Sequence, residues 1–279
     1  MLFNFAFGIN NKYSKYVRII INSICINHPS NYLKFHILTD YISNKNIKKI
    51  TKEVQQYKNA EIFIHNIDKK YFQGLYTGNW HLSTWYRVLL PEMLDTTIDR
   101  VLYLDADTIV NGDLSSLFKL NMTNNSIAGV HDLIPFAKER KEPIGISNKG
   151  KYICAGVMMM NLNFWRKNKI TEKILNYARE NASVLFCPDQ DSINAICNES
   201  IKLLPFKYGY VREFHNKKDS IIFHYSSTYP WQTIYRPPHY LIWKKYNDRA
   251  KYPVKTTWNN FILGLKIYGY KIISAFKKI

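Results

Sequence analysis

The chain has 279 residues, and its 46% hydrophobic and 22% charged content is ordinary for a globular protein, so we expect a packed core in one large α/β domain. The net charge of +18 indicates an anionic partner: nucleic acid, an anionic membrane surface or a phosphorylated saccharide. No arginine-rich tract or nucleic-acid-binding module occurs, so we expect no nucleic-acid partner. No apolar run approaches the roughly 20 residues of a membrane-spanning helix, and residues 1–11 do not form a signal peptide.

Strands alternate with helices along the first part of the chain. We expect, in order, a strand at Leu2–Gly8, a helix at Tyr13–Asn27, a strand at Leu33–Thr39, a helix at Asn44–Tyr57 and a strand at Glu61–Ile64. Alternation at this spacing is typical of βαβ units, which build a mostly parallel sheet.

The apolar run Arg100–Leu104 (RVLYL) predicts a short central strand, preceded by a helix at Ser83–Met93. The remaining expected elements are strands near Ser126–Val130, Ile153–Met160 and Ser220–His224, and helices near Thr171–Asn181 and Asp189–Cys197. No repeat or low-complexity linker interrupts this series. The sequence therefore predicts a single α/β domain over residues 1–252.

The segment 253–279 has a different composition, with lysines interspersed among aromatic and aliphatic residues at roughly helical spacing. Such a basic amphipathic segment suits the headgroup layer of an anionic membrane. The alternative is a terminal helix that docks on the domain and leaves its lysines in solvent. We expect the membrane-associated form.

The four cysteines are Cys25, Cys154, Cys187 and Cys197, and none of them forms a C-x-x-C pair. Three of them lie in apolar runs. This distribution is typical of reduced, buried thiols rather than of a disulfide framework or a zinc site. We therefore expect a cytoplasmic protein, peripheral at the inner face of the cell membrane.

Asp105 and Asp107 directly follow the strand Arg100–Leu104. In open α/β sheets, ligands bind beyond the carboxyl ends of strands, so two carboxylates at this point can converge on one divalent cation. Oxygen ligands favour Mg²⁺ or Mn²⁺. The simpler alternative is a pair of solvated turn carboxylates.

The same residues allow a different enzyme class. The segment LDADT also resembles the phosphoaspartate motif of haloacid-dehalogenase-type phosphatases, in which the first aspartate is the nucleophile and the second a general acid/base. That motif normally follows the first strand of its domain. Here about three βα elements precede Asp105, which this alternative leaves unexplained.

Six segments together resemble the retaining bacterial glycosyltransferases of family 8, the group of lipopolysaccharide and lipooligosaccharide galactosyl- and glucosyltransferases to which glycogenin is distantly related. They are FAFGINNKYSKY, HLSTWYR, RVLYLDADTIV, CAGVMMMNL, PDQDSIN and FHYSSTYPW, in the family's order. The resemblance implies a GT-A fold and retaining transfer of a hexose, galactose or glucose. It also implies a UDP-sugar donor and a saccharide or lipid-linked glycan acceptor, as in lipopolysaccharide biosynthesis.

The resemblance also implies roles for individual residues. Asp105, Asp107 and His224 match the metal ligands, and an imidazole beside two carboxylates suits Mn²⁺ especially. Arg87 matches an arginine that organises the donor phosphate and the nearby carboxylates, and Asn10 lies in the loop that reads uracil and ribose. The full set of residues matched to donor binding is Phe7, Gly8, Asn10, Tyr13, Arg87, Leu104, Asp105, Ala106, Asp132, Cys154, Ala155, Gly156, Asp189 and Gln190.

Asp189, Gln190 and Asp191 match the catalytic segment of the family. Asp189 would hydrogen-bond sugar hydroxyls, and Gln190 would lie on the face of the anomeric carbon opposite the leaving group. Because glutamine is a poor nucleophile, we expect same-side substitution, in which the departing phosphate oxygen helps to deprotonate the acceptor. Asp191 is the alternative nucleophile, and capping of a helix N-terminus is a structural role that these aspartates can fill at the same time.

Two residues depart from the family pattern. Cys154 stands where an asparagine usually contacts the donor sugar, and a thiol is a weak hydrogen-bond partner, so the resemblance does not distinguish galactose from glucose. Tyr229 stands where a lysine normally contacts phosphate, and Arg236 is a candidate substitute. These departures leave open a third reading, a non-catalytic protein that binds anionic glycans or membranes with a degenerate glycosyltransferase fold.

Overall fold

The computed structural model describes residues 1–132, 137–209, 220–226, 229–231 and 239–255. A seven-stranded sheet runs through its centre in the order β3-β2-β1-β4-β7-β6-β8. Its strands are β1 (Leu2–Gly8), β2 (Tyr32–Thr39), β3 (Ala60–Asn66), β4 (Arg100–Leu104), β6 (Ile127–His131), β7 (Ile153–Asn161) and β8 (Ile201–Leu204). A separate two-stranded sheet pairs β5 (Thr108–Val110) with β9 (Ile222–His224).

The large sheet is mixed but mostly parallel. β1 is parallel to both β2 and β4, β2 is parallel to β3, and β6 is parallel to β8. Only β7 runs the other way, antiparallel to its neighbours β4 and β6. The predicted α/β class with a mixed, mostly parallel sheet is confirmed.

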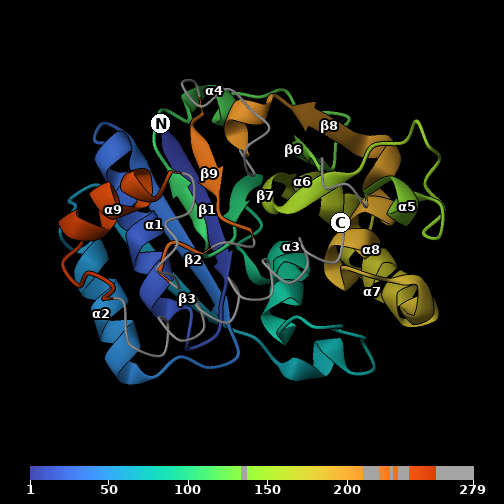
Figure 1. Cartoon of the computed structure of the whole chain (residues 1–279), viewed down its shortest axis with the longest axis horizontal. Helices are drawn as coiled ribbons and strands as arrows, with labels where there is room; N and C mark the ends of the chain where they lie inside the picture. Colours follow the sequence, from blue (N-terminus) through green and yellow to red (C-terminus); the bar gives the residue numbers. More distant parts are fainter. Residues whose placement is uncertain (133–136, 210–219, 227–228, 232–238, 256–279) are drawn as a thin grey trace, which may run out of the picture.

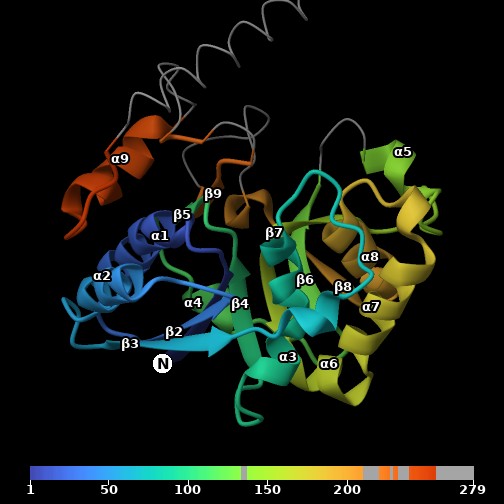
Figure 2. The ribbon, with the colours of Figure 1, turned by 90° about the horizontal axis from the view of Figure 1, so that it is seen from below.

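Helices cover both faces of the sheet (Figures 1 and 2). One face packs against α1 (Ser14–Asn27) and α2 (Asn44–Val54), and the other against α3 (Leu90–Met93), α6 (Leu162–Lys167), α7 (Ile170–Glu180) and α8 (Pro188–Cys197). The shorter helices are α4 (Ser115–Phe118), α5 (Ala137–Lys141) and the 3₁₀ segments Lys69–Phe72, Leu82–Leu89, Ala182–Val184, Asn198–Ser200 and Phe206–Tyr208.

Alternation along β1 shows how the sequence specifies this layering. Phe3, Phe5 and Phe7 are fully buried on the α1–α2 face, whereas Ala6 belongs to the cluster on the opposite face. Successive side chains of a strand point to opposite faces, so a strand that is buried along most of its length has to be covered on both sides. β1 therefore occupies the middle of the sheet, next to the strand that carries Asp105.

The last helix of the described residues is α9 (Tyr240–Arg249), which lies beside α1 in Figure 1. Trp243 and Tyr246 of α9 are buried against Tyr16 and Ile19 of α1, and Val254 packs into the same cluster. Among the described residues, no helix combines the length and the apolar character that crossing a lipid bilayer requires. The expected amphipathic segment at 253–279 lies outside the described residues from 256 onward.

The structure corrects the helix predicted at Ser83–Met93. Leu82–Leu89 is a 3₁₀ helix, and α3 begins only at Leu90. Pro91 lies in the first turn of α3, where its missing N–H costs no hydrogen bond. The ring nitrogen Nδ1 of His81 accepts a hydrogen bond from the Ser83 amide at 3.1 Å and thereby caps the 3₁₀ segment.

A buried histidine on β2 predicts a pH dependence of folding. The pKa of His36 is lowered to about 3, mainly by burial and also by His65, whose Nε2 lies 3.1 Å from Nδ1 of His36. Because the pKa is lower in the folded chain than its ordinary value of 6.5, protons bind the unfolded chain preferentially. The contribution of neutral His36 to the free energy of unfolding is fully present above pH 6.5, and it is lost as the pH falls toward 3.

We therefore expect the free energy of unfolding of the wild type to fall more steeply between about pH 6 and pH 4 than that of His36→Gln. The difference in slope amounts to about 1.4 kcal/mol per pH unit, the linkage of one proton. Urea unfolding of both proteins across this range measures it. Parallel pH profiles for the two proteins would show that His36 is not buried in its neutral form.

Candidate functional site

A cavity of about 430 Å³ opens at the carboxyl ends of β1 and β4, where Gly8 and Asp105 line it. β2 and β4 flank β1 on opposite sides, so the chain reverses its direction of travel across the sheet at this point. Ligands of open α/β sheets bind in the crevice beyond such a switch point. The predicted location of the site at the end of Arg100–Leu104 is thus where the structure has its cavity.

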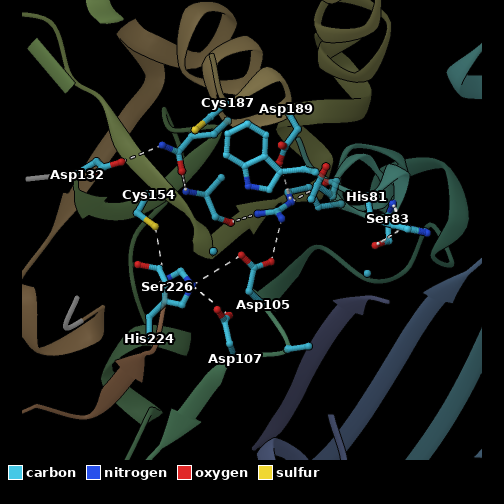
Figure 3. Close-up of a pocket in the computed structure, with 18 of the residues that line it drawn as sticks. His81, Ser83, Asp105, Asp107, Asp132, Cys154, Cys187, Asp189, His224 and Ser226 are labelled. Atoms are coloured by element: carbon cyan, nitrogen blue, oxygen red, sulfur yellow. Dashed lines mark hydrogen bonds and ion pairs between the residues drawn. The ribbon is translucent and has the colours of Figure 1, made fainter. Parts of the chain in front are cut away.

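Asp105, Asp107 and His224 converge at one side of this cavity (Figure 3). The Nε2 atom of His224 lies 3.2 Å from Oδ1 of Asp107 and 3.9 Å from Oδ2 of Asp105. One ligand atom from each residue lies within 4.8 Å of the other two, a spacing that one cation can bridge. The predicted metal ligands are therefore brought together by the fold.

Pairing of β5 with β9 explains how a residue 117 positions after Asp107 reaches it. β5 follows the Asp-Ala-Asp turn directly, and Thr108 lies opposite His224 in the antiparallel register. The amide of Tyr225 also donates to the carbonyl of Asp107 at 2.9 Å. This short ladder places His224 beside the two carboxylates.

Gly156 on β7 forms the floor beneath these three side chains. Its carbonyl accepts a hydrogen bond from the Asp105 amide at 2.8 Å. A Cβ atom at this position would overlap Cε1 of His224 and lie 2.7 Å from Oδ2 of Asp105. Only glycine leaves room for the two ligands in this arrangement, which fits a cradle built around an ion.

The buried side chain of Arg87 contacts the carboxylates of Asp105 and Asp189. Its side chain is only 4% exposed, and its guanidinium contacts Asp105 Oδ1 at 2.8 Å, Asp189 Oδ2 at 3.3 Å and the Ala155 carbonyl at 2.5 Å. The hydroxyl of Tyr103 donates to the same oxygen of Asp105 at 2.9 Å. Arg87 thus contacts the carboxylates of both Asp105 and Asp189, as its predicted role requires, and its guanidinium is occupied by these contacts.

Neighbouring charges and burial shift the pKa values of two site residues, Asp189 and His224. Burial raises the pKa of Asp189, Arg87 opposes this change and Asp105 adds to it, and the resulting pKa is about 6. Burial would lower the pKa of His224, but the Asp107 carboxylate outweighs it, so the pKa lies well above 6.5. The same negative charge that favours a proton on the imidazole also favours a divalent cation. When a cation binds, it replaces that proton, and the imidazole is neutral.

Gln190 is held at both ends of its side-chain amide. Its Oε1 accepts from the Ala155 amide at 2.9 Å, and its Nε2 donates to Asp132 Oδ2 at 2.9 Å and to the Tyr152 hydroxyl at 3.1 Å. Gln190, Asp132, Ala155 and Asp189 all line the cavity. The residues predicted to surround the transferred sugar therefore form one continuous wall.

Four predicted residues lie elsewhere. Asp191 is buried, and its oxygens accept from the amides of residues 186 and 187 at 2.7 Å and from the Tyr152 hydroxyl at 2.5 Å. It fixes the start of α8 and does not line the cavity, a placement that does not support its suggested role as a nucleophile. The side chains of Phe7 and Leu104 belong to the core beneath α1 and α2 and do not line the cavity.

Asn10 has a local role in this structure. Its side-chain carbonyl accepts from the amides of Lys12 and Tyr13 at 3.0 and 3.1 Å, and it stabilises the turn that leads into α1. That oxygen is the atom expected to accept from uracil, so the arrangement does not support this contact. Three other residues matched to donor binding, Gly8, Tyr13 and Ala106, line the cavity.

The two departures from the family pattern both lie in the cavity. The Cys154 sulfur is 3.6 Å from Nδ1 of His224, on the opposite side of the ring from the carboxylates. Tyr229 lines the cavity and stacks on Trp231 with ring centroids 5.2 Å apart. Arg236, the suggested substitute for a phosphate-binding lysine, lies outside the described residues. Cys154 and Cys187 are half-buried, whereas Cys25 and Cys197 are fully buried, and all four are free thiols.

Several residues of the site were not found from the sequence. Tyr103 looked like part of an apolar strand, but its buried hydroxyl donates to the cavity residue Asp105. Trp80, Arg140 and Phe186 line the cavity, although they come from three separate segments. No local pattern marks such residues, because only the tertiary fold brings them together.

Comparison with known proteins gives a consistent result. The model of "Glycosyl transferase family 8" matches residues 4–234. A lipopolysaccharide 1,2-glucosyltransferase of Escherichia coli is 30% identical over 248 residues, which cover 82% of this chain and 73% of that protein. A lipopolysaccharide 1,3-galactosyltransferase of Salmonella typhimurium is 26% identical, with 79% and 67% covered.

Solved structures resemble the fold. The crystal structure of the galactosyltransferase LgtC in complex with donor and acceptor sugar analogues has a TM-score of 0.80 at 21% identity. The match covers 90% of this chain and 96% of that one. The predicted GT-A fold is confirmed by this likeness.

Proposed function

The chain belongs to glycosyltransferase family 8, and from this premise we propose that it transfers galactose or glucose from a UDP-hexose to a saccharide acceptor of the lipopolysaccharide type. The family membership excludes the aspartate-based phosphatase, whose motif would follow the first strand rather than β4. The observation that supports the proposed donor most strongly is the convergence of Asp105, Asp107 and His224 over Gly156. Two carboxylates and an imidazole at a switch point suit the diphosphate of a nucleotide sugar and its cation.

The residues fit a divalent cation by their chemistry and by the space that Gly156 leaves. Mn²⁺ or Mg²⁺ held by Asp105, Asp107 and His224 would neutralise the charge that builds up on the UDP leaving group. The imidazole ligand favours Mn²⁺ over Mg²⁺, which prefers oxygen ligands and water.

The other residues of the cavity orient the reactants. Arg87 and Tyr103 hold the Asp105 carboxylate in one direction, so that it does not have to be reorganised when the donor binds. Asp189 faces the cavity from the N-terminus of α8 and would accept hydrogen bonds from sugar hydroxyls. Asp132, fixed by Gln190, would bind the sugar from the other side.

Membership of family 8 implies retention of the anomeric configuration, and the described cavity wall offers no free nucleophile for a double displacement. Gln190 carries no charge and both ends of its amide are engaged, Asp191 lies outside the cavity, and Asp189 is paired with Arg87. We infer substitution on the same face, in which the acceptor hydroxyl gives its proton to the departing phosphate oxygen. The C–O bond to UDP breaks as the bond to the acceptor oxygen forms beside it.

Incubation with UDP-glucose or UDP-galactose in the presence of Mn²⁺ tests this function. We expect slow release of UDP by hydrolysis without acceptor, faster release with a lipopolysaccharide-core saccharide, and no release after chelation of the metal. The absence of UDP release from every UDP-hexose, with or without acceptor, would support the degenerate, non-catalytic alternative instead.

We also propose that the segment 253–279 holds the enzyme at an anionic membrane surface, in keeping with the charge of +18. Near the end of the described residues, the amide of Val254 donates to Oδ1 of Asn247 at 2.7 Å. A chain that ends at Lys255 keeps this hydrogen bond and the packing of Val254. We expect this truncated chain to lose most of its co-sedimentation with phosphatidylserine vesicles while the full chain binds. Equal co-sedimentation of both proteins would refute membrane attachment through this segment.

A further inference from the structure

Exposed aromatic rings stand on the side of the cavity away from the metal ligands. Figure 3 labels Cys187 and Asp189 on the side opposite Asp107 and His224. Phe186, next to Cys187, is 59% exposed, and Trp80 is 39% exposed, and both line the cavity. Their ring centroids lie 6.1 Å apart at an interplanar angle of 66°. Large aromatic surfaces left open at a cavity indicate a ligand with an apolar face.

An arginine completes this group. The guanidinium carbon of Arg140 lies 4.0 Å from the centroid of the Phe186 ring, and Nη1 donates to the thiol of Cys187 at 3.2 Å. Arg140 also donates to the Tyr152 hydroxyl and interacts with the Asp191 carboxylate. The aromatic rim, by which we mean Trp80, Phe186 and Arg140, therefore places a cation beside exposed aromatic rings at the cavity.

The backbone holds the rim in place. Gly78 adopts a φ of +59°, and a Cβ atom there would lie 3.1 Å from Cε3 of Trp80 and 3.6 Å from Cδ of Pro188. The left-handed conformation lets the loop approach both residues closely. Trp80 is thus positioned beside the start of α8 and beside Phe186, although the two aromatic residues lie 106 positions apart.

We propose that the aromatic rim is the acceptor subsite and that it selects a saccharide bearing an anionic group, phosphate or carboxylate. This inference rests on the proposed function. The donor diphosphate belongs at Asp105, Asp107 and His224, and its hexose at Asp132, Asp189 and Gln190. The acceptor then has to approach the hexose from the side that the rim occupies.

The chemistry of the rim fits such an acceptor. The C–H face of a pyranose ring packs on an aromatic ring, and the fork of a guanidinium binds two oxygens of a phosphate or carboxylate. Arg87 is committed to Asp105 and Asp189 deep in the wall, so Arg140 is the arginine of the described cavity that is left for a ligand. The carboxylates of Asp132 and Asp189 line the neighbouring wall and would repel an anion placed against them.

Binding of small sugars to the protein saturated with UDP and Mn²⁺ tests the proposal. The probes are glucose, glucose 6-phosphate and glucuronic acid, measured by ligand-observed NMR titration. We expect at least one of the two anionic sugars to bind about tenfold more tightly than glucose, and the one preferred identifies the anionic group. In Arg140→Gln this preference falls to within about twofold. Phe186→Ala weakens all three sugars alike, because it removes the stacking surface and keeps the charge.

Arg249→Gln is the matched control, since this exposed arginine at the end of α9 lies outside the cavity, and it should bind all probes as the wild type does. Equal affinity of glucose and both anionic sugars for the wild type would overturn the proposal, as would a preference that survives in Arg140→Gln. UDP binding in the presence of Mn²⁺ is measured in a separate experiment, which tests the proposed function independently of the acceptor subsite. If the wild type does not bind UDP, the proposed function itself fails, whereas intact UDP binding without the anionic preference refutes only the acceptor subsite.

Discussion

Replacement of Asp107 by alanine is expected to lower the rate of UDP release by about a thousandfold. Asp107 supplies one of two carboxylates to the proposed cation site and holds the His224 imidazole at 3.2 Å. Its removal leaves the cation with one carboxylate and a histidine that is no longer oriented, and the charge on the leaving group loses its main stabilisation. Loss of one preorganised electrostatic contact commonly costs 10²–10³ in rate, and here a ligand and its neighbour are affected together.

The matched control for this variant is Asp248→Ala. Asp248 is an exposed aspartate on α9 that pairs with Lys244, and exposed ion pairs contribute little to stability. We expect this control to keep the wild-type rate and melting temperature. An Asp107→Ala protein that is folded and retains more than about a tenth of the wild-type rate would contradict the metal assignment.

The second large effect is expected from Gly156→Ala, which adds one methyl group and removes no functional atom. The new Cβ would overlap Cε1 of His224 and approach Oδ2 of Asp105 at 2.7 Å. Both atoms belong to backbone-anchored ligands that cannot move aside without opening the site. Shifts of residues that support metal ligands cost 10–100-fold in metal affinity, and a direct displacement of two ligands should reach about 100-fold or more.

Mn²⁺ affinity, measured by electron paramagnetic resonance in the presence of UDP, reports this effect without relying on turnover. Gly112→Ala is the control, because a Cβ there meets only Ile221 at ordinary contact distances of 3.4 Å and more. We expect Gly112→Ala to bind Mn²⁺ as tightly as the wild type. Undiminished Mn²⁺ affinity in Gly156→Ala would mean that the ion does not lie between His224 and Asp105.

The elements that the sequence predicted well are those with a strong local pattern. The mostly apolar β1 and β4 were found within a residue of their observed bounds, because a strand buried on both faces needs a largely apolar run. The short strand β5 was missed. Its three residues carry no alternation of their own, and it exists through pairing with β9.

The site shows the same division between local and tertiary information. Asp105 and Asp107 could be placed from the strand that precedes them, and His224 was matched only through the resemblance to the family. For Asp191, a role at the N-terminus of a helix could be expected from the sequence, but its position outside the cavity could not, because its partners are the amides of residues 186 and 187. Arg140 was missed because its partner Phe186 is distant in sequence.

The central claim is tested most directly by anomalous diffraction at the manganese edge from crystals grown with UDP and Mn²⁺. The account predicts one anomalous peak about 2.0–2.3 Å from a carboxylate oxygen of Asp105, a carboxylate oxygen of Asp107 and Nε2 of His224, with the UDP diphosphate completing its coordination. Bound UDP with no peak among these three side chains, or a peak at another place in the cavity, would contradict it.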